Sequence, residues 1–109
     1  EMGENGEGQL TQLARTLQSI SAKIPKDLDW VLRVDGHTDR VPIKTAAFPS
    51  NWELSTARAI SVVKFLVSQG IPARNLAAAG FGEFRPLDDR TDEIAYRRNR
   101  RIELKLDQR

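Results

Sequence analysis

Three polar residues in one short stretch of this sequence could take part in ligand chemistry. FPSNWELSTARA, residues 48–59, is typical of a loop that runs into a helix, yet its first turns carry Asn51, Ser55 and Arg58, which a purely structural helix would not need. On a helical projection Arg58 lies among apolar side chains near the positive end of the helix, where a cation gains nothing from the macrodipole. Its side chain therefore either extends to water or meets an anion.

A second group, made of His37, Asp39 and Ser55, could be read as a hydrolytic set. A single histidine in a loop is more often structural, and a serine inside a helix does not stand on a nucleophile elbow. GFGEFRP, residues 80–86, lacks both the Lys-Ser/Thr of a phosphate-binding loop and the full Gly-x-Gly-x-x-Gly spacing. We therefore expect no enzymatic activity, no catalytic residues and no cofactor.

The densest run of positive charge is RRNRR, residues 97–101. The chain has 17 Lys and Arg residues against 15 Asp and Glu residues, so the basic surplus is only 2, and the run offers no aromatic side chains on which bases could stack. A solvated protein face explains this run better than nucleic acid binding. The sequence has no cysteine, which excludes thiolate metal sites. Because it has only one histidine, we expect no metal site of another kind.

Length and composition are those of one globular domain. A chain of 109 residues suffices for a single modest core, and 39% hydrophobic with 29% charged residues argues against disorder. No apolar run approaches the roughly 20 residues that span a bilayer, and no signal peptide is visible, so we expect any targeting or anchoring segment to lie outside this chain. We interpret residues 1–8 as a linker or an artificial end and residues 9–109 as the domain.

Hydrophobic spacing predicts how the first half of the chain positions the polar residues. An amphipathic helix is expected over residues 9–24, a half-buried strand over residues 30–36, and a long loop after that strand. Ser50 and Glu53 are spaced as a capping box, so the second helix begins at Asn51. The wide apolar arc of this helix predicts that it is covered on most sides.

The second half of the chain is predicted to complete a small sheet. Residues 76–81 are a candidate buried strand, and the strand, helix, strand order across residues 30–81 favours a parallel pair. A short helix over residues 91–97 leads to a final strand over residues 101–106, in which apolar and charged side chains alternate.

Several segments together carry the pattern of a known family: VDGHTD, NWELSTARA, Gly-Ile at residues 70–71, GFGEFRP and NRRIEL. In their order and spacing, from about residue 9 to residue 106, they resemble the OmpA-like peptidoglycan-binding domain. The long loop before the second helix resembles that of the MotB branch, from the flagellar motor. The resemblance implies an α/β fold, an α+β sandwich of the order β/α/β/α/β, with helices packed on one face of a small mixed sheet.

The resemblance also implies recognition of the diaminopimelate residue of the peptidoglycan stem peptide. Asp39 and Arg58 match the residues that do most of this work in the family. The free end of diaminopimelate is a zwitterion, with an ammonium for the carboxylate and a carboxylate for the planar guanidinium. The same motifs add further candidate binding residues: Thr38, Asn51, Leu54, Ser55, Asn99 and Arg100.

The roles of the further candidates differ. Asn51 and the backbone amides near Leu54 are expected to donate hydrogen bonds to the ligand carboxylate, because a helix N-terminus favours anions. Ser55 either joins them or only bonds back within its helix. Asn99 and Arg100 either line the pocket or lock a loop. A competing expectation for Arg58 is that it pairs internally with Asp39 and is structural.

Two features depart from the family pattern. Tyr96 stands three residues before Asn99, where many members carry an arginine, so one auxiliary ligand contact is in question. The strand that usually precedes the first helix is absent from this sequence, which could leave an open sheet edge.

The resemblance implies a domain that anchors a membrane-attached envelope protein to the cell wall in the periplasm of a Gram-negative bacterium. Peptidoglycan is the expected partner, and nucleic acid is not. Contact with a membrane is expected only through a segment outside this chain. Whether the domain forms a homodimer is left open. The alternative is an interaction or dimerisation module of an envelope complex, with the same fold but no cell-wall ligand. Binding of a soluble muropeptide that contains diaminopimelate separates the two interpretations.

Overall fold

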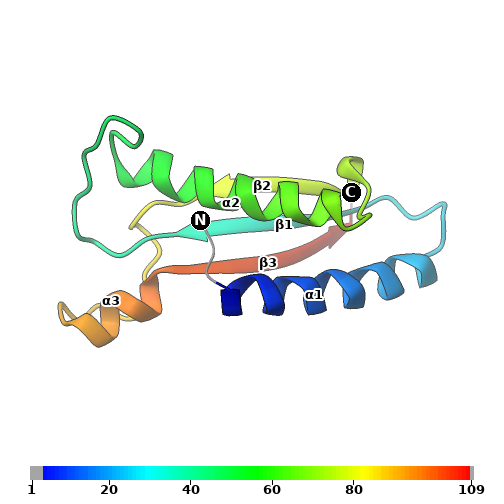
Figure 1. The fold of residues 1–109 in the computed structure, drawn as a ribbon, viewed down its shortest axis with the longest axis horizontal. Helices are drawn as coiled ribbons and strands as arrows, with labels where there is room; N and C mark the ends of the chain where they lie inside the picture. The colour runs from blue at the N-terminus through cyan, green and yellow to red at the C-terminus, as the bar shows by residue number, and fades with distance from the viewer. Residues whose placement is uncertain (1–3, 109) are drawn as a thin grey trace.

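The structure is a computed structural model that describes residues 4–108, with side chains from residue 8 onward. α1 and α2 run along a small sheet, and α3 lies beyond one end of it (Figure 1). The elements follow one another in this order: α1 (Glu4–Lys23), β1 (Trp30–His37), α2 (Asn51–Ser68), the 3₁₀ helix η1 (Ala73–Asn75), β2 (Leu76–Gly80), α3 (Glu93–Asn99) and β3 (Arg101–Gln108).

Two helices begin at other residues than predicted. α1 begins at Glu4, so residues 4–8 of the predicted linker are helical, while residues 1–3 lie outside the described range. The apolar spacing that predicts the helix starts only at Leu10. Once the helix is packed against the core at that residue, backbone hydrogen bonds can extend it toward the N-terminus, and such bonds require no apolar side chains in the sequence. α3 begins at Glu93 because Asp92 caps it, its Oδ1 accepting a hydrogen bond from the Ala95 N–H at 2.8 Å.

β1 is the central strand of a three-stranded mixed sheet with the order β2-β1-β3. It pairs with β2 in parallel and with β3 antiparallel, and α2 connects the parallel pair, as predicted. Leu32 lies beside Leu76 and Val34 beside Leu104, which gives the sheet one apolar face. In the described part of the chain no further strand pairs with β2 or β3, the two edge strands.

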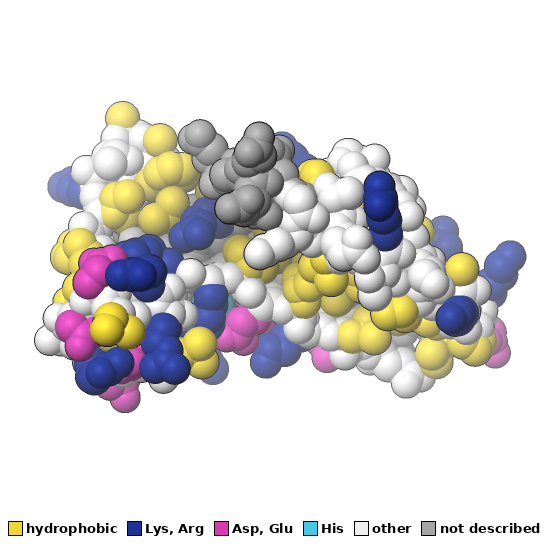
Figure 2. Space-filling view, turned by 60° about the horizontal axis from the view of Figure 1, so that its bottom comes forward, with side chains coloured by type: hydrophobic (Ala, Val, Ile, Leu, Met, Phe, Trp, Pro, Cys, Tyr) yellow, Lys and Arg dark blue, Asp and Glu magenta, His cyan; other side chains and the backbone are white. Residues whose placement is uncertain are grey.

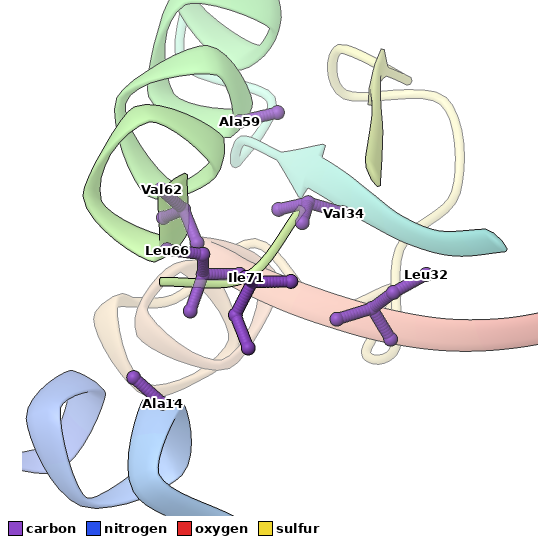
Figure 3. Packing of buried hydrophobic residues seen from close by; sticks show 7 residues of the cluster. All are labelled: Ala14, Leu32, Val34, Ala59, Val62, Leu66 and Ile71. Carbon is purple, nitrogen blue, oxygen red and sulfur yellow. The ribbon is translucent and has the colours of Figure 1, made fainter. Parts of the chain in front are cut away.

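α1 and α2 cover this apolar face, so the predicted arrangement of helices on one side of a mixed sheet is confirmed. Figure 3 shows side chains from α1, α2 and β1 pointing toward a common centre. A buried aliphatic side chain of this kind contributes roughly 1.5–3 kcal/mol. The buried cluster consists of Ala14, Leu32, Val34, Ala59, Val62, Leu66 and Ile71.

α2 is covered on one side only, and the prediction that it is covered on most sides is wrong. Ala59 and Leu66 are fully buried, whereas Ile60 and Val67 are each 41% exposed. A sheet of three strands and one neighbouring helix contact α2 from one direction, so part of its wide apolar arc faces outward.

Two glycines bring the first turns of α2 close to the sheet. Gly36 and Gly80 are neighbours in the register of β1 and β2. A Cβ atom on Gly36 would collide with the backbone carbonyl of Ser55, and one on Gly80 with the side chain and backbone of Thr56. The start of α2 therefore lies against the C-terminal ends of both parallel strands, the region where open α/β sheets commonly bind ligands.

Candidate ligand-binding site

A cavity of about 420 Å³ lies at this end of the molecule, between the loop after β1, the start of α2 and helix α3. Figure 2 shows hydrophobic side chains gathered at this end, with Lys or Arg and Asp or Glu side chains beside them. Such a mixture of apolar wall and a few charged groups is typical of small-ligand sites. The wall includes most of the predicted site residues: Thr38, Asp39, Asn51, Leu54, Arg58 and Arg100.

Asp39 is buried, and protein donors hold both of its carboxylate oxygens. Oδ1 accepts a hydrogen bond from the Val41 N–H at 3.0 Å, and Oδ2 accepts one from Nη1 of Arg100 at 2.6 Å. Arg100 also donates from Nη2 to Oε2 of Glu93 at 2.9 Å. Hydrogen bonds to Glu93 and then to Asp39 raise the pKa of Arg100. One wall of the cavity is thus a fixed row of two carboxylates with a guanidinium between them.

Arg58 is the cation of this cavity that has no partner within the part of the chain that the structure describes. It is half-buried in the wall, and among the described residues it has neither an ion pair nor a hydrogen bond. The expectation that Arg58 pairs internally with Asp39 is wrong, because Arg100 takes that place. The five donors of its planar guanidinium therefore make no hydrogen bond to the described residues.

Asn51 and Leu54 line the cavity, but their donors are already engaged. Nδ2 of Asn51 donates to the Val41 carbonyl at 3.2 Å and to Oε1 of Glu83 at 3.0 Å. The Leu54 N–H donates to the Ser50 carbonyl at 3.2 Å. The hydrogen bonds expected from these groups to a ligand carboxylate would have to replace existing ones. In this structure Asn51 ties the loop after β1 to the start of α2.

Thr38 contributes to the wall in a similar, structural way. Its hydroxyl donates to the Asp39 carbonyl at 2.9 Å, and its N–H donates to the Gly82 carbonyl at 2.9 Å. Thr38 therefore fixes the backbone of Asp39 and, through it, the direction of the Asp39 side chain.

Ser55 and Asn99 are buried outside the cavity wall. The Ser55 hydroxyl donates to a carbonyl three residues earlier at 3.1 Å and accepts from the Gly82 N–H at 2.9 Å. Oδ1 of Asn99 accepts from the Leu87 N–H at 2.8 Å, and its Nδ2 donates back to the same loop at 2.9 Å. Their geometry favours the alternatives in which Ser55 bonds back within its helix and Asn99 locks a loop.

Sequence reasoning missed part of the wall, since it did not single out Glu93 or residues 41–43 and noted Tyr96 only as a departure from the family pattern. Glu93 and Tyr96 of α3 line the cavity, together with residues 41–43. Tyr96 is the departure from the family pattern, and it places a phenol ring where many members carry an arginine. Residues three or four apart share one face of a helix, so the spacing of Glu93, Tyr96 and Arg100 was a signal that could have found them.

His37, Asp39 and Ser55 do not come together as a hydrolytic set. Gly36 faces α2, so the next residue, His37, faces the opposite side of the sheet from Ser55. Its ring stacks on Phe81 with centroids 5.1 Å apart, and burial lowers its pKa. In residues 4–108 no group of His, Cys, Asp and Glu is placed to hold a metal ion.

The charged side chains of the cavity match a ligand that carries both signs. Asp39 and Glu93 are acidic, and Arg58 and Arg100 are basic. A zwitterion can place its ammonium at the two carboxylates and its carboxylate at the unpaired Arg58. An ion of one sign alone would leave part of the site with an uncompensated charge.

Known proteins share both the sequence pattern and the fold. A profile of the OmpA family matches residues 4–100. The chain belongs to the OmpA family. Curated relatives of this OmpA-family domain include the protein YtxE of Bacillus subtilis, 37% identical over 102 residues, and motility protein B of the same species, 36% identical over 72 residues. Outer membrane protein A of Serratia odorifera is 42% identical over 102 residues.

Solved structures agree with this assignment. The C-terminal domain of Helicobacter pylori MotB has a TM-score of 0.85 at 24% identity, over 98% of this chain and 76% of that one. The peptidoglycan-associated lipoprotein of Burkholderia pseudomallei has a TM-score of 0.76 at 22% identity, over 98% of this chain and 81% of that one. At these identities the likeness shows the fold. The predicted OmpA-like family, with its MotB-like pattern, is confirmed.

The matched relatives are longer proteins than this chain. The matches to YtxE, motility protein B and outer membrane protein A cover 93%, 65% and 94% of the chain but only 39%, 28% and 37% of those proteins. Another similar structure is the periplasmic domain of Helicobacter pylori MotB, so envelope proteins carry domains of this kind. No helix within residues 4–108 is both long and apolar enough to cross a membrane.

Proposed function

We propose that this OmpA-family domain binds peptidoglycan without a covalent bond, through the diaminopimelate residue of the stem peptide. The observation that carries the proposal is the unpaired Arg58 in the same cavity as the buried Asp39 carboxylate. A similar fold in a peptidoglycan-associated lipoprotein supports it. Binding of this kind anchors a cell-envelope protein to the wall and requires no catalysis.

In this proposal each charged group of the cavity has one role. The ligand ammonium binds at Asp39 and Glu93, and Arg58 donates two parallel hydrogen bonds to the ligand carboxylate. Arg100 holds both protein carboxylates in place, so that the ammonium meets a preorganised site. Tyr96 and the apolar loop residues pack against the methylene chain of diaminopimelate.

The residue range of the binding domain and its cellular location are part of the proposal. The proposed peptidoglycan-binding domain covers residues 9–109, and the part of α1 from residue 9 onward belongs to it because Ala14 lies in the core. The parent protein lies in the periplasm of a Gram-negative bacterium and reaches a membrane through a segment outside this chain.

Sedimentation with purified Gram-negative sacculi tests the proposal. We expect the domain to pellet with sacculi and free meso-diaminopimelate to release it. Pimelate lacks the ammonium groups and 1,5-diaminopentane lacks the carboxylates, so neither compound should compete at the same concentration. Competition by either one as strong as that by diaminopimelate contradicts recognition of a zwitterion.

A folded domain that stays in the supernatant at low salt refutes the proposed function. In that case the domain acts as an interaction or dimerisation module, and sedimentation equilibrium reports its self-association. No binding to mixed-sequence DNA or RNA is expected at physiological ionic strength, because the basic run of residues 97–101 is largely paired with acidic side chains.

A further inference from the structure

Two aromatic side chains are stacked on one another at the surface, next to the candidate site. Trp52, in the first turn of α2, and Phe84, in the loop after β2, have ring centroids 5.0 Å apart and an angle of 27° between the rings. Trp52 is 51% exposed and Phe84 is 58% exposed, and neither belongs to the buried core. About half of each ring stays in water, and exposed aromatic surface next to a cavity is typical of a place where a ligand or partner packs.

Trp52 also forms one side of a shallow groove of about 400 Å³ on the outer face of α2. The half-exposed Ile60 lies in this groove, on the side of α2 that none of the described helices and strands covers. Two residues with oxygen atoms, Glu53 and Thr56, stand beside the apolar ones. The groove is lined by Ala47, Phe48, Trp52, Glu53, Thr56, Ala57 and Ile60.

The groove is continuous with the candidate site through a third, smaller hollow of about 270 Å³. This hollow shares Leu54 and Arg58 with the candidate site, and it shares Phe48 and Ala57 with the groove. A single surface track therefore leads from the charged cavity, past Arg58 and Phe48, to the Trp52 ring.

We infer that this track binds the glycan strand that carries the stem peptide, with a pyranose ring packed on Trp52. The inference rests on the proposed function. One face of a pyranose ring presents C–H groups that pack on an aromatic ring, while its hydroxyls point sideways to hydrogen-bonding groups. The groove offers this combination, with an indole ring and the Glu53 carboxylate next to it, whereas the Thr56 hydroxyl donates to the Trp52 carbonyl at 2.8 Å and lies against Gly80.

The length of a stem peptide allows one ligand to reach both ends of the track. Arg58 and Trp52 are six residues apart on α2, which corresponds to about 9 Å along the helix axis at about 1.5 Å per residue. Because Arg58 is proposed to bind the free end of diaminopimelate, the methylene chain of that residue and about 7 Å of extended peptide, from two further residues, lie between Arg58 and the group that links the peptide to the sugar. A peptide held at Arg58 is thus long enough for its sugar to reach the Trp52 ring.

Calorimetric titration with two matched ligands tests the inference. One ligand is the free stem tetrapeptide with meso-diaminopimelate, and the other is the same tetrapeptide on its disaccharide. We expect the disaccharide to increase affinity about fivefold. Trp52→Ala should bring the affinity for the disaccharide ligand down to that for the free peptide, and should leave the free-peptide affinity unchanged within about twofold.

Further variants separate stacking from general effects. Trp52→Tyr keeps a ring and should retain most of the gain, whereas Leu87→Ala removes an even more exposed apolar side chain outside the track and should change nothing. In a Trp30→Phe background the remaining indole is Trp52, and its fluorescence should respond to the disaccharide ligand but not to the free peptide.

Each result decides a separate point. If neither ligand binds, the proposed function fails and the inference fails with it. If both ligands bind with equal affinity, the charged site stands and the glycan track is refuted. If Trp52→Ala weakens both ligands equally, the ring supports the peptide site only. If Trp52→Ala converts a dimer to a monomer in sedimentation equilibrium, the occupant of the track is a second copy of the chain.

Discussion

Asp39 and Arg100, 61 residues apart in the chain, are joined by a hydrogen bond of 2.6 Å between Oδ2 and Nη1. Arg58, the cation that the sequence pattern places with Asp39, lies in the same cavity without a partner among the described residues. The two arginines therefore have different roles. Arg100 pairs with Asp39 in the structure, and Arg58 is the residue that the proposal assigns to the ligand carboxylate.

The pairing of Asp39 with Arg100 predicts where stability depends on this site. Asp39→Ala removes the acceptor of two hydrogen bonds and should lower the free energy of unfolding by about 1–2 kcal/mol. In a double-mutant cycle with Arg100→Ala the coupling should be about 0.5–1 kcal/mol, since the Arg100 side chain is 36% exposed and water screens the pair. Urea unfolding of the single and double variants measures this coupling free energy. A cycle with Arg58→Ala should give a coupling near zero, and a larger value there contradicts the structure.

The same geometry predicts that Asp39→Ala and Arg58→Lys affect binding more than folding. Arg58→Lys should change the free energy of unfolding by less than about 0.5 kcal/mol, because Arg58 pairs with none of the described residues. Sacculus binding should weaken at least about tenfold, since an ammonium cannot present two parallel donors to a carboxylate. Asp39→Ala should cost about 2–5 kcal/mol of binding. Thermal melts beside sacculus pull-downs measure both quantities.

Arg74→Lys is the matched control for Arg58→Lys. Arg74 is exposed in η1, after the C-terminal end of α2, and does not line the cavity. The Arg74→Lys variant should bind sacculi as strongly as the unmodified domain. Strong destabilisation by Arg58→Lys, with binding lost only together with folding, contradicts a ligand role.

Gly36 is predicted to be intolerant of any side chain. Its Cβ atom would collide with the Ser55 carbonyl, so Gly36→Ala has to push α2 away from the sheet and should destabilise the domain by about 1–3 kcal/mol. Gly8→Ala in α1 is the control, because nothing lies within 4 Å of its Cβ position, and it should stabilise the helix by up to about 1 kcal/mol. Chemical denaturation compares the two, and equal effects would argue against the close approach.

The buried His37 predicts a loss of stability in mild acid. Burial, then the charge of Arg101 and, more weakly, that of Lys105 lower its pKa below the ordinary 6.5, while the charges of Glu103 and Asp35 oppose this shift without cancelling it. Below about pH 6.5 the unfolded chain therefore binds a proton that the folded chain does not, and the free energy of unfolding falls until the pH reaches the folded pKa.

Urea unfolding between pH 8 and pH 5 measures this effect. His37→Phe, which keeps a ring to stack on Phe81, should lack this part of the pH dependence, whereas the unmodified domain should show it. Carboxylates titrate in both proteins, so only the difference between the two curves reports His37. Parallel curves would show that His37 does not contribute.

Patterns of local spacing were enough to predict most of the elements and the family. The capping box at Ser50 and Glu53 places the start of α2 at Asn51, as in the structure. Alternation of apolar residues predicts β1 and β3, because a strand with one buried face requires it. The start of α1 escaped prediction, since its first residues carry no apolar side chain that the core selects.

The sequence by itself determined which residues carry charge and on which element each stands, including Asp39 in the loop and Arg58 on the helix. Only the tertiary structure decided which groups meet. Asn99 and Arg100 are adjacent in sequence, yet one locks a buried loop and the other lines the cavity with Asp39. Ser55 stands one turn from Arg58, yet faces the sheet. The spacing of apolar residues reflects local geometry within a few residues of the chain. Contacts between side chains that are tens of residues apart depend instead on how closely the helices and strands pack. That packing is set by the whole core and by glycines such as Gly36.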